Sequence, residues 1–184
     1  HRPRLARVVP CSAPMRIVFV SPYFTDNAKL FIDALSRLPG ARLGLVAQED
    51  VSRLPDDTRS RLAGFELVGD ALAPKEIVAA TQRLSAKLGG VDRLLGVLEQ
   101  IQIPIAEAQA ELGLPGLGVE VAKNFRDKNR MKEILREAGL PVACHRQVTS
   151  AVEAESFAAE VGYPIIVKPP AGVASQATYR ATDE

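Results

Sequence analysis

The amino-acid sequence predicts an α/β protein. Residues 15–113 are expected to form a parallel, doubly wound sheet, and the first part of an α+β unit follows. Three observations lead to this prediction. Solid apolar runs of strand length alternate with segments that repeat apolar residues at helical spacing. Glycine and proline stand where one kind of segment gives way to the next. After residue 113 this βα alternation stops, and a connection punctuated by glycine and proline begins.

The first strand and helix are predicted directly after Met15. RIVFVS at 16–21 is a solid apolar run, as expected of a buried parallel strand. Thr25 stands where a helix N-cap belongs, and Pro39-Gly40 ends that helix. The apolar residues at helical spacing between them are Leu30, Phe31, Ala34, Leu35 and Leu38.

The same order repeats to residue 113. Pro74 is suited to the first position of a second helix, whose apolar face holds Ile77, Val78, Leu84 and Leu88 and which Gly89-Gly90 ends. The remaining expected segments are a strand at 41–47, a polar loop at 48–57, strands at 64–69 and 91–99, and a helix at 104–112 closed by Gly113. Repeated βα units predict helices on both faces of the sheet.

The second half is expected to contain two helices and three strands. Ser150 and Glu153 form a capping box, which predicts a helix over 151–161. The earlier helix begins at 124 or 125 and ends before Gly139 and Pro141, with Met131, Ile134, Leu135 and Ala138 as its apolar stripe. The other expected segments are a connection at 114–123, strands at 142–148 and 162–170, a small-residue loop at 171–177, and a returning strand at 178–181.

Composition excludes several classes of protein. The 23 basic and 22 acidic residues give a net charge of +1, so general binding to nucleic acid or an acidic membrane is not expected. The basic stretch 123–136 has one aromatic residue and is interpreted as a solvated helix face. No apolar run approaches the ~20 residues of a membrane span. Residues 1–14 lack a continuous apolar stretch and are predicted to be a disordered leader.

The two cysteines, Cys11 and Cys144, match no metal-ligand spacing and no disulfide framework. We interpret them as reduced thiols of a cytoplasmic protein, with Cys144 buried near a strand. His1 and His145 are isolated from one another, and His145 is expected to be a surface residue of a strand. No metal site is therefore predicted within these residues.

Two lysines are candidates for chemistry. Lys168 ends the apolar run IIVK directly before Pro169-Pro170 and a loop of small residues, where backbone N–H groups and an ammonium can meet phosphate oxygens. Lys128 falls at the edge of the apolar stripe of its helix, whereas Lys132 and Arg136 are expected further round. Taken alone, Lys168 is more simply interpreted as a strand-end lysine that points to water, and Lys128 as a lysine whose stem covers apolar surface.

Taken together, FRDKNRMKEILREAGLPV and GYPIIVKPPAGVASQATYR resemble the start of the ATP-grasp family. The resemblance implies that Lys128 and Lys168 bind nucleotide phosphates and that the loop covers them. It therefore implies a phosphate site of Lys128, Lys168, Gly172, Ala174 and Ser175. Many relatives have three or more glycines in this loop, whereas Gly172 stands alone here.

The resemblance also implies two domains, a pre-ATP-grasp α/β domain at 15–118 and an incomplete ATP-grasp subdomain at 119–184. The parent enzyme would resemble ligases that use ATP and Mg²⁺ to activate a carboxylate as an acyl phosphate for attack by an amine. A carboxylase with a similar nucleotide-binding fold stays open as an alternative identity of the parent enzyme. Metal ligands are expected beyond residue 184, so the fragment is expected to be inactive. Catalytic residues and the carboxylate stay unknown, and dimerisation is expected through the open sheet edge.

Two alternatives stay open from the residues alone. RIVFVSPYF at 16–24 is similar to the opening strand of a glycosyltransferase, although no glycine follows to admit a sugar nucleotide. A flavodoxin-like binding or regulatory module would suit residues 15–113. Neither alternative accounts for Lys128 and Lys168. No GxGxxG opens a helix after a strand, and there is no GxxxxGK[ST].

Overall fold

A computed structural model describes residues 14–172 and 177–183 of the chain. The predicted leader, except Pro14, therefore lies outside the described residues, as does Cys11. The described residues form two sheets, one of four strands and one of two. No helix among them is long and apolar enough to cross a membrane.

The larger sheet is parallel, with the strand order β3-β2-β1-β4. Its strands are β1 (Met15–Ser21), β2 (Ala41–Ala47), β3 (Gly64–Leu67) and β4 (Arg93–Leu95). In the register of the central pair, Met15 lies opposite Ala41 and Ser21 lies opposite Ala47. The apolar runs of both strands are buried, as a parallel sheet covered on both faces requires.

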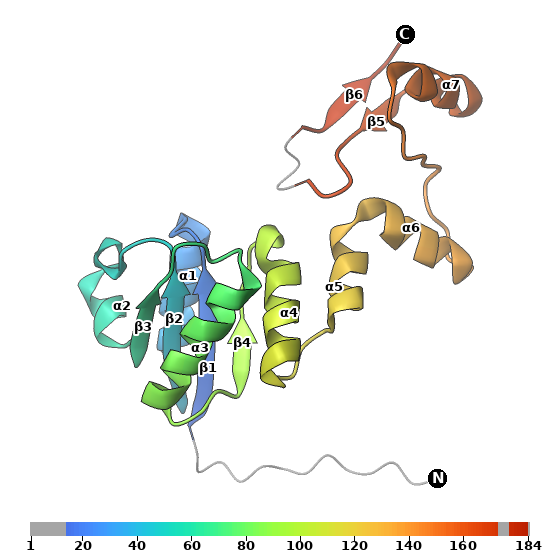
Figure 1. Ribbon diagram of the computed structural model, residues 1–184. Helices are drawn as coiled ribbons and strands as arrows, with labels where there is room; N and C mark the ends of the chain where they lie inside the picture. Colours follow the sequence, from blue (N-terminus) through green and yellow to red (C-terminus); the bar gives the residue numbers. More distant parts are fainter. Residues whose placement is uncertain (1–13, 173–176, 184) are drawn as a thin grey trace, which may run out of the picture.

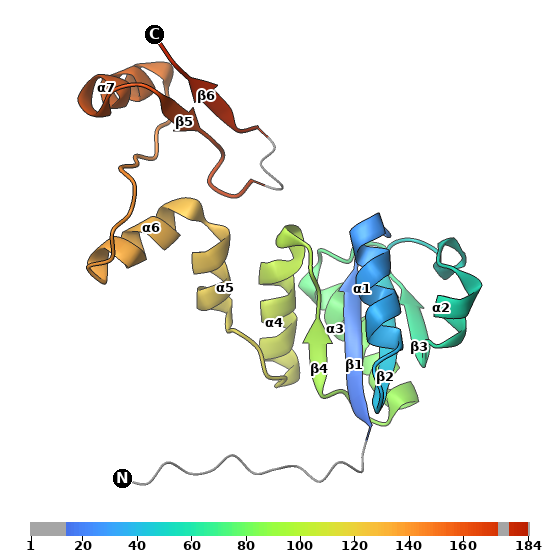
Figure 2. The same ribbon diagram turned by 180° about the vertical axis from the view of Figure 1, so that it is seen from behind.

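Helices cover both faces of this sheet, as predicted (Figures 1 and 2). Odd-numbered residues of β1, such as Ile17 and Phe19, form one core cluster with Ile32 of α1. Even-numbered residues, such as Val18, form the other cluster with α3. The helices of this part are α1 (Asp26–Ser36), α2 (Asp56–Ser60), α3 (Pro74–Leu88) and α4 (Gln102–Leu112), with short 3₁₀ helices η1 (Val51–Arg53) and η2 (Glu99–Ile101).

Glycine allows α3 to lie close to the sheet. Leu84 of α3 is fully buried against β2 and β3. A Cβ on Gly64 would lie 2.8 Å from Leu84 Cδ2, and a Cβ on Gly44 would lie 3.2 Å from Leu84 Cδ1. The two glycines oppose each other in the β2–β3 register, so together they leave room for this leucine. The α/β fold class predicted from the sequence is confirmed.

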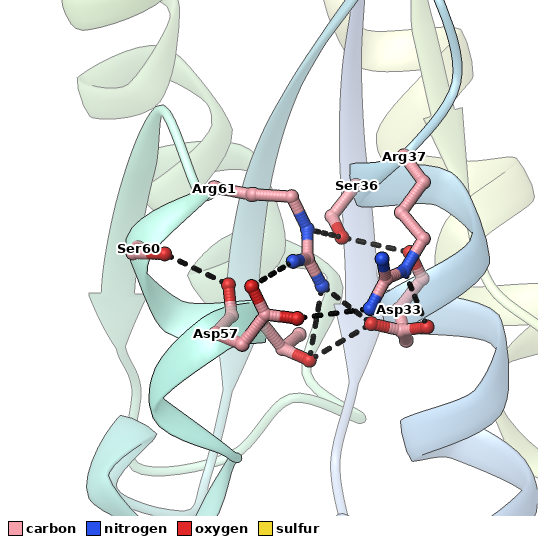
Figure 3. A network of polar contacts seen from close by, with 7 residues as sticks. Asp33, Ser36, Arg37, Asp57, Ser60 and Arg61 are labelled. Carbon is pink, nitrogen blue, oxygen red and sulfur yellow. Dashed lines mark hydrogen bonds and ion pairs between the residues drawn. The ribbon is translucent and has the colours of Figure 1, made fainter.

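The predicted polar loop at 48–57 is partly wrong, because it contains η1 and the start of α2. A polar network fixes α2 to α1 (Figure 3). Asp33 of α1 accepts hydrogen bonds from Arg37 at 2.9 Å and from Thr58 Oγ1 at 3.0 Å. Arg37 also donates to Asp57 at 2.9 Å, and Arg61 pairs with both carboxylates. The hydrogen bond from Arg37 is the main cause of the lowered pKa of Asp33.

The second half contains α5 (Val119–Arg126), α6 (Lys128–Glu137), α7 (Ala151–Val161), β5 (Ile165–Val167) and β6 (Tyr179–Ala181). The last two strands form an antiparallel hairpin in which Ile165 lies opposite Ala181. The helix start predicted at Ser150 is confirmed, because Ser150 Oγ accepts from Glu153 N at 3.3 Å. Glu153 Oε2 in turn accepts from Thr149 N at 2.7 Å, one residue before the cap.

The single helix predicted from 124 or 125 to 138 is wrong, and the connection predicted at 114–123 is partly wrong, because α5 begins at Val119. Two helices, α5 and α6, meet at Asp127, whose φ of −95° and ψ of 115° are not helical. The Asp127 carboxylate caps α6 by accepting from Asn129 N at 2.8 Å and Arg130 N at 3.1 Å. Aspartate competes for backbone donors in this way, which favours a helix start over a helix interior.

The strand predicted at 142–148 is also wrong. Residues 142–148 have no regular secondary structure. Within the described part of the chain, β5 pairs only with β6, so this segment has no partner strand. The strands predicted at 91–99 and 162–170 are shorter than expected, at 93–95 and 165–167.

Candidate functional site

A cavity of about 760 Å³ lies among α6, the segment 143–148, α7 and the hairpin strands. Its polar and charged lining side chains among the described residues are Lys128, Asn129, Lys132, Cys144, His145, Arg146, Gln147, Lys168 and Tyr179. Ile165, Val167, Phe157 and Val161 supply much of the apolar wall. The volume is in the range of pockets that hold small-molecule ligands.

Lys128 and Lys168 line the same cavity, although 40 positions separate them. Lys168 follows the last residue of β5, and Lys128 is the first residue of α6. The backbone joins the two positions, because Lys128 N donates to the carbonyl oxygen of Pro170 at 3.1 Å. The structure therefore brings together the two lysines that the sequence singled out.

Lys132 is a third lysine of the cavity, which the sequence analysis missed. Lys132 was expected to point away from this face. It lies one turn after Lys128, at the i,i+4 spacing that places two side chains on the same side of a helix. Burial lowers the pKa of Lys132, and the positive charges of Lys168 and Arg136 lower it further. The i,i+4 spacing was the signal that could have identified it.

The lining carries positive charge without a matching negative charge. Lys128, Lys132, Lys168 and Arg146 are all lining residues, and none of the described lining residues is Asp or Glu. Arg146 is paired outside the lining, with Glu160, and stacks over the Phe157 ring at 5.1 Å from its centroid. Like charges gathered in a cavity repel one another, so a bound anion would be favoured there.

Cys144 and His145 line the cavity beside Lys132. The expectation that Cys144 is buried is wrong, because this free thiol is exposed in a segment that forms no strand. His145 is half-buried, and its Nδ1 lies 2.8 Å from Arg136 Nη2. Burial is the main cause of the lowered pKa of His145, and the charges of Lys132 and Arg136 lower it further.

Gly172 does not line the cavity in the structure, although the sequence placed it in the phosphate site. Its carbonyl oxygen accepts from Arg126 Nη1 at 2.7 Å. Ala174 and Ser175 lie outside the described residues. Across residues 14–172 and 177–183, no group of three or more His, Cys, Asp or Glu side chains is arranged to hold a metal ion.

Residues 127–181 match the family model described as the carbamoyl-phosphate synthase L chain, ATP binding domain. Alanine–anticapsin ligase of Bacillus subtilis (strain 168) is 33% identical over 164 residues, which are 85% of this chain and 35% of that protein. D-alanine–D-alanine ligase of Ectopseudomonas mendocina (strain ymp) is 34% identical over 98 residues, 53% of this chain and 28% of that protein. The chain thus spans about a third of the length of these curated relatives.

Two solved structures share the fold. The crystal structure of L-amino acid ligase from Bacillus licheniformis has a TM-score of 0.69 and 21% identity, and the match covers 93% of this chain and 40% of that chain. The ADP complex of an N5-carboxyaminoimidazole ribonucleotide synthetase has a TM-score of 0.70 and 15% identity, covering 94% of this chain and 42% of that chain. At these identities the likeness supports the fold alone.

Proposed function

Because this chain belongs to the ATP-grasp family, we propose that it forms the ATP-binding part of a ligase that activates a carboxylate as an acyl phosphate. An amine or a similar nucleophile would then displace the phosphate. The observation that supports this most directly is the meeting of Lys128 and Lys168 in one cavity without an acidic residue in its described lining. The matched segment 127–181 contains both lysines.

In this proposal the lysines neutralise the charge of the ATP phosphates. Phosphoryl transfer depends mainly on positioning and on stabilising charge, so ammonium groups held at fixed places on α6 and after β5 serve that purpose. Lys132 would add a third charge to this site. Burial and its cationic neighbours lower its pKa, which disfavours the charged form when no anion is bound. A triphosphate would relieve the repulsion that these neighbours exert on it.

Mg²⁺ accompanies ATP in most phosphoryl-transfer enzymes and belongs to this proposal. The described residues offer no cluster of His, Cys, Asp or Glu that would hold it. We therefore assign no step of the reaction to a metal held by these side chains.

The substrate carboxylate is proposed from the relatives. Two of them are named as ligases of alanine or D-alanine, so amino-acid carboxylates come first among the compounds to be tested.

We further propose a domain boundary near residue 118, because Leu112 and Leu114 still pack on the core of the larger sheet. A cytoplasmic location fits the free, exposed Cys144, because thiols stay reduced there. The homodimer and the lack of nucleic-acid binding remain predictions.

The test is a calorimetric titration of the native full-length protein with Mg·ATP. Lys128→Met and Lys168→Met each remove one charge and keep an unbranched side chain. Loss of a charge-assisted contact of about 1.5–3 kcal/mol would weaken binding roughly 10- to 150-fold. Lys75→Met, on the exposed first turn of α3 and away from the cavity, is the matched control and should bind like wild type.

Release of ADP in the presence of candidate amino acids would then identify the carboxylate. The proposal fails if the wild-type protein binds no ATP. It also fails if both lysine variants bind ATP as wild type does. Circular dichroism of each variant would establish that the fold is retained.

A further inference from the structure

Arg126 joins the chain that leaves β5 to the end of α5. It is the last residue of α5, and its side chain is only 14% exposed. Its guanidinium donates from Nη1 to the carbonyl oxygen of Gly172 at 2.7 Å and from Nη2 to that of Ala171 at 2.9 Å. The planar fork of an arginine is suited to two acceptors on neighbouring residues.

The segment after β5 depends on donors from elsewhere. Pro169 and Pro170 have no N–H group, so this stretch cannot continue the ladder of the hairpin. Three successive carbonyl groups, those of Pro170, Ala171 and Gly172, instead accept hydrogen bonds from the junction of α5 and α6. The donors are Lys128 N for the first and Arg126 for the other two. The junction that carries Lys128 therefore holds the chain that carries Lys168.

Arg126 also faces the larger sheet. Its Nη1 lies 3.8 Å from Oε2 of Glu99, which follows β4 and begins η2. This distance is long for an ion pair, and Glu99 is half exposed, so the pair itself contributes little to stability. The guanidinium therefore lies between Glu99 and the two carbonyl groups.

We propose that Arg126 is a positioning residue of the phosphate site, which fixes the chain after β5 so that Lys168 faces Lys128 across the cavity. The inference rests on the proposed function. Arg126 does not itself line the cavity, so its effect on a bound phosphate would pass through Lys168 and the backbone of residues 170–172. Arg130, one turn further along, differs because it pairs with Glu120 on an exposed surface.

The experiment compares Mg·ATP affinity in the native full-length protein for Arg126→Gln, Arg126→Lys and the control Arg130→Gln. Arg126→Gln removes the charged fork and is expected to weaken binding about tenfold, the effect of one lost charge-assisted hydrogen bond. Arg126→Lys can restore one of the two contacts, so its affinity should fall between those of glutamine and wild type. Arg130→Gln should bind within about twofold of wild type, because an exposed pair has little effect.

A double-mutant cycle with Lys168→Met separates positioning from a general loss of stability. If Arg126 acts through Lys168, the double variant should bind no more weakly than Lys168→Met alone, since the effects of coupled residues do not add. Additive losses would overturn the inference, as would wild-type affinity in Arg126→Gln. If Lys168→Met weakens binding and Arg126→Gln does not, only this inference fails. If wild type binds no ATP, the proposed function fails and the inference fails with it.

Discussion

Asp127 is the residue whose substitution best tests how local structure positions the candidate site. Its carboxylate caps α6 through two backbone N–H groups, at 2.8 Å and 3.1 Å, and the next residue is Lys128. Asp127→Ala leaves both donors without this acceptor. Loss of an N-cap costs about 1 kcal/mol, within a range of roughly 0.5–2 kcal/mol. The free energy of unfolding should fall by that amount.

The same substitution should weaken ATP binding. We expect Lys128 to face the cavity only when the first turn of α6 is formed. Without the cap, part of the free energy of ATP binding is therefore used to form that turn, and the measured affinity falls. A loss of about 1 kcal/mol corresponds to a roughly fivefold rise in Kd, and the upper end of the range, about 2 kcal/mol, sets the largest effect expected, roughly thirtyfold. The two measurements are urea denaturation followed by circular dichroism, and calorimetric titration with Mg·ATP.

Two further variants decide between positioning and general destabilisation. Ser150→Ala removes the cap of α7, which accepts from Glu153 N at 3.3 Å, and should lower stability without changing ATP affinity by more than about twofold. Asp127→Asn keeps a good N-cap and should retain both stability and affinity. Equal losses of affinity in Asp127→Ala and Ser150→Ala would refute the reasoning. So would an Asp127→Asn variant that behaves like Asp127→Ala.

Two predictions concern the larger sheet. The methyl group of Gly96→Ala would lie 2.5 Å from Ile105 Cδ1 and 3.1 Å from the carbonyl oxygen of Val20, so overpacking should cost about 1–3 kcal/mol in chemical denaturation. Unchanged stability would contradict this packing. Hydrogen bonds from Arg16 lower the pKa of Asp92 to about 2. Because this folded-state pKa lies below the ordinary value of about 3.9, Asp92 stabilises the fold above pH ~4, and the contribution is lost as pH falls towards 2. Asp92→Asn should flatten this part of the acid-unfolding curve, and an unaltered curve would count against it.

Much of the fold could be predicted from local patterns. The apolar run of β2 predicted its bounds, 41–47, and Thr25 and Ser150 were recognised as caps because their side chains satisfy donors only a few residues away. The pair of lysines was recognised because each stands in a distinctive local setting, one near a helix start and one at a strand end. Such features depend on neighbours in sequence, so the sequence displays them directly.

Two of the errors concern residues whose structure depends on a segment distant in sequence. The strand predicted at 142–148 required a neighbouring strand, and none of those described pairs with it. The burial predicted for Cys144 failed for the same reason, because the environment of the thiol depends on that missing pairing. Asp127 stood inside a helical pattern, and its role as a cap became visible only when the chain direction changed there.

The sequence by itself determined the α/β class, most helix and strand positions, and the likeness of Lys128 and Lys168 to phosphate-binding residues. Only the tertiary structure decided that these two lysines share a cavity, that Lys132 joins them, and that Arg126 holds the chain after β5. The physical reason is sequence separation. Periodicity and capping record interactions within a few residues, whereas the contacts between Arg126 and residues 171–172 exist only after segments about 45 positions apart have packed together.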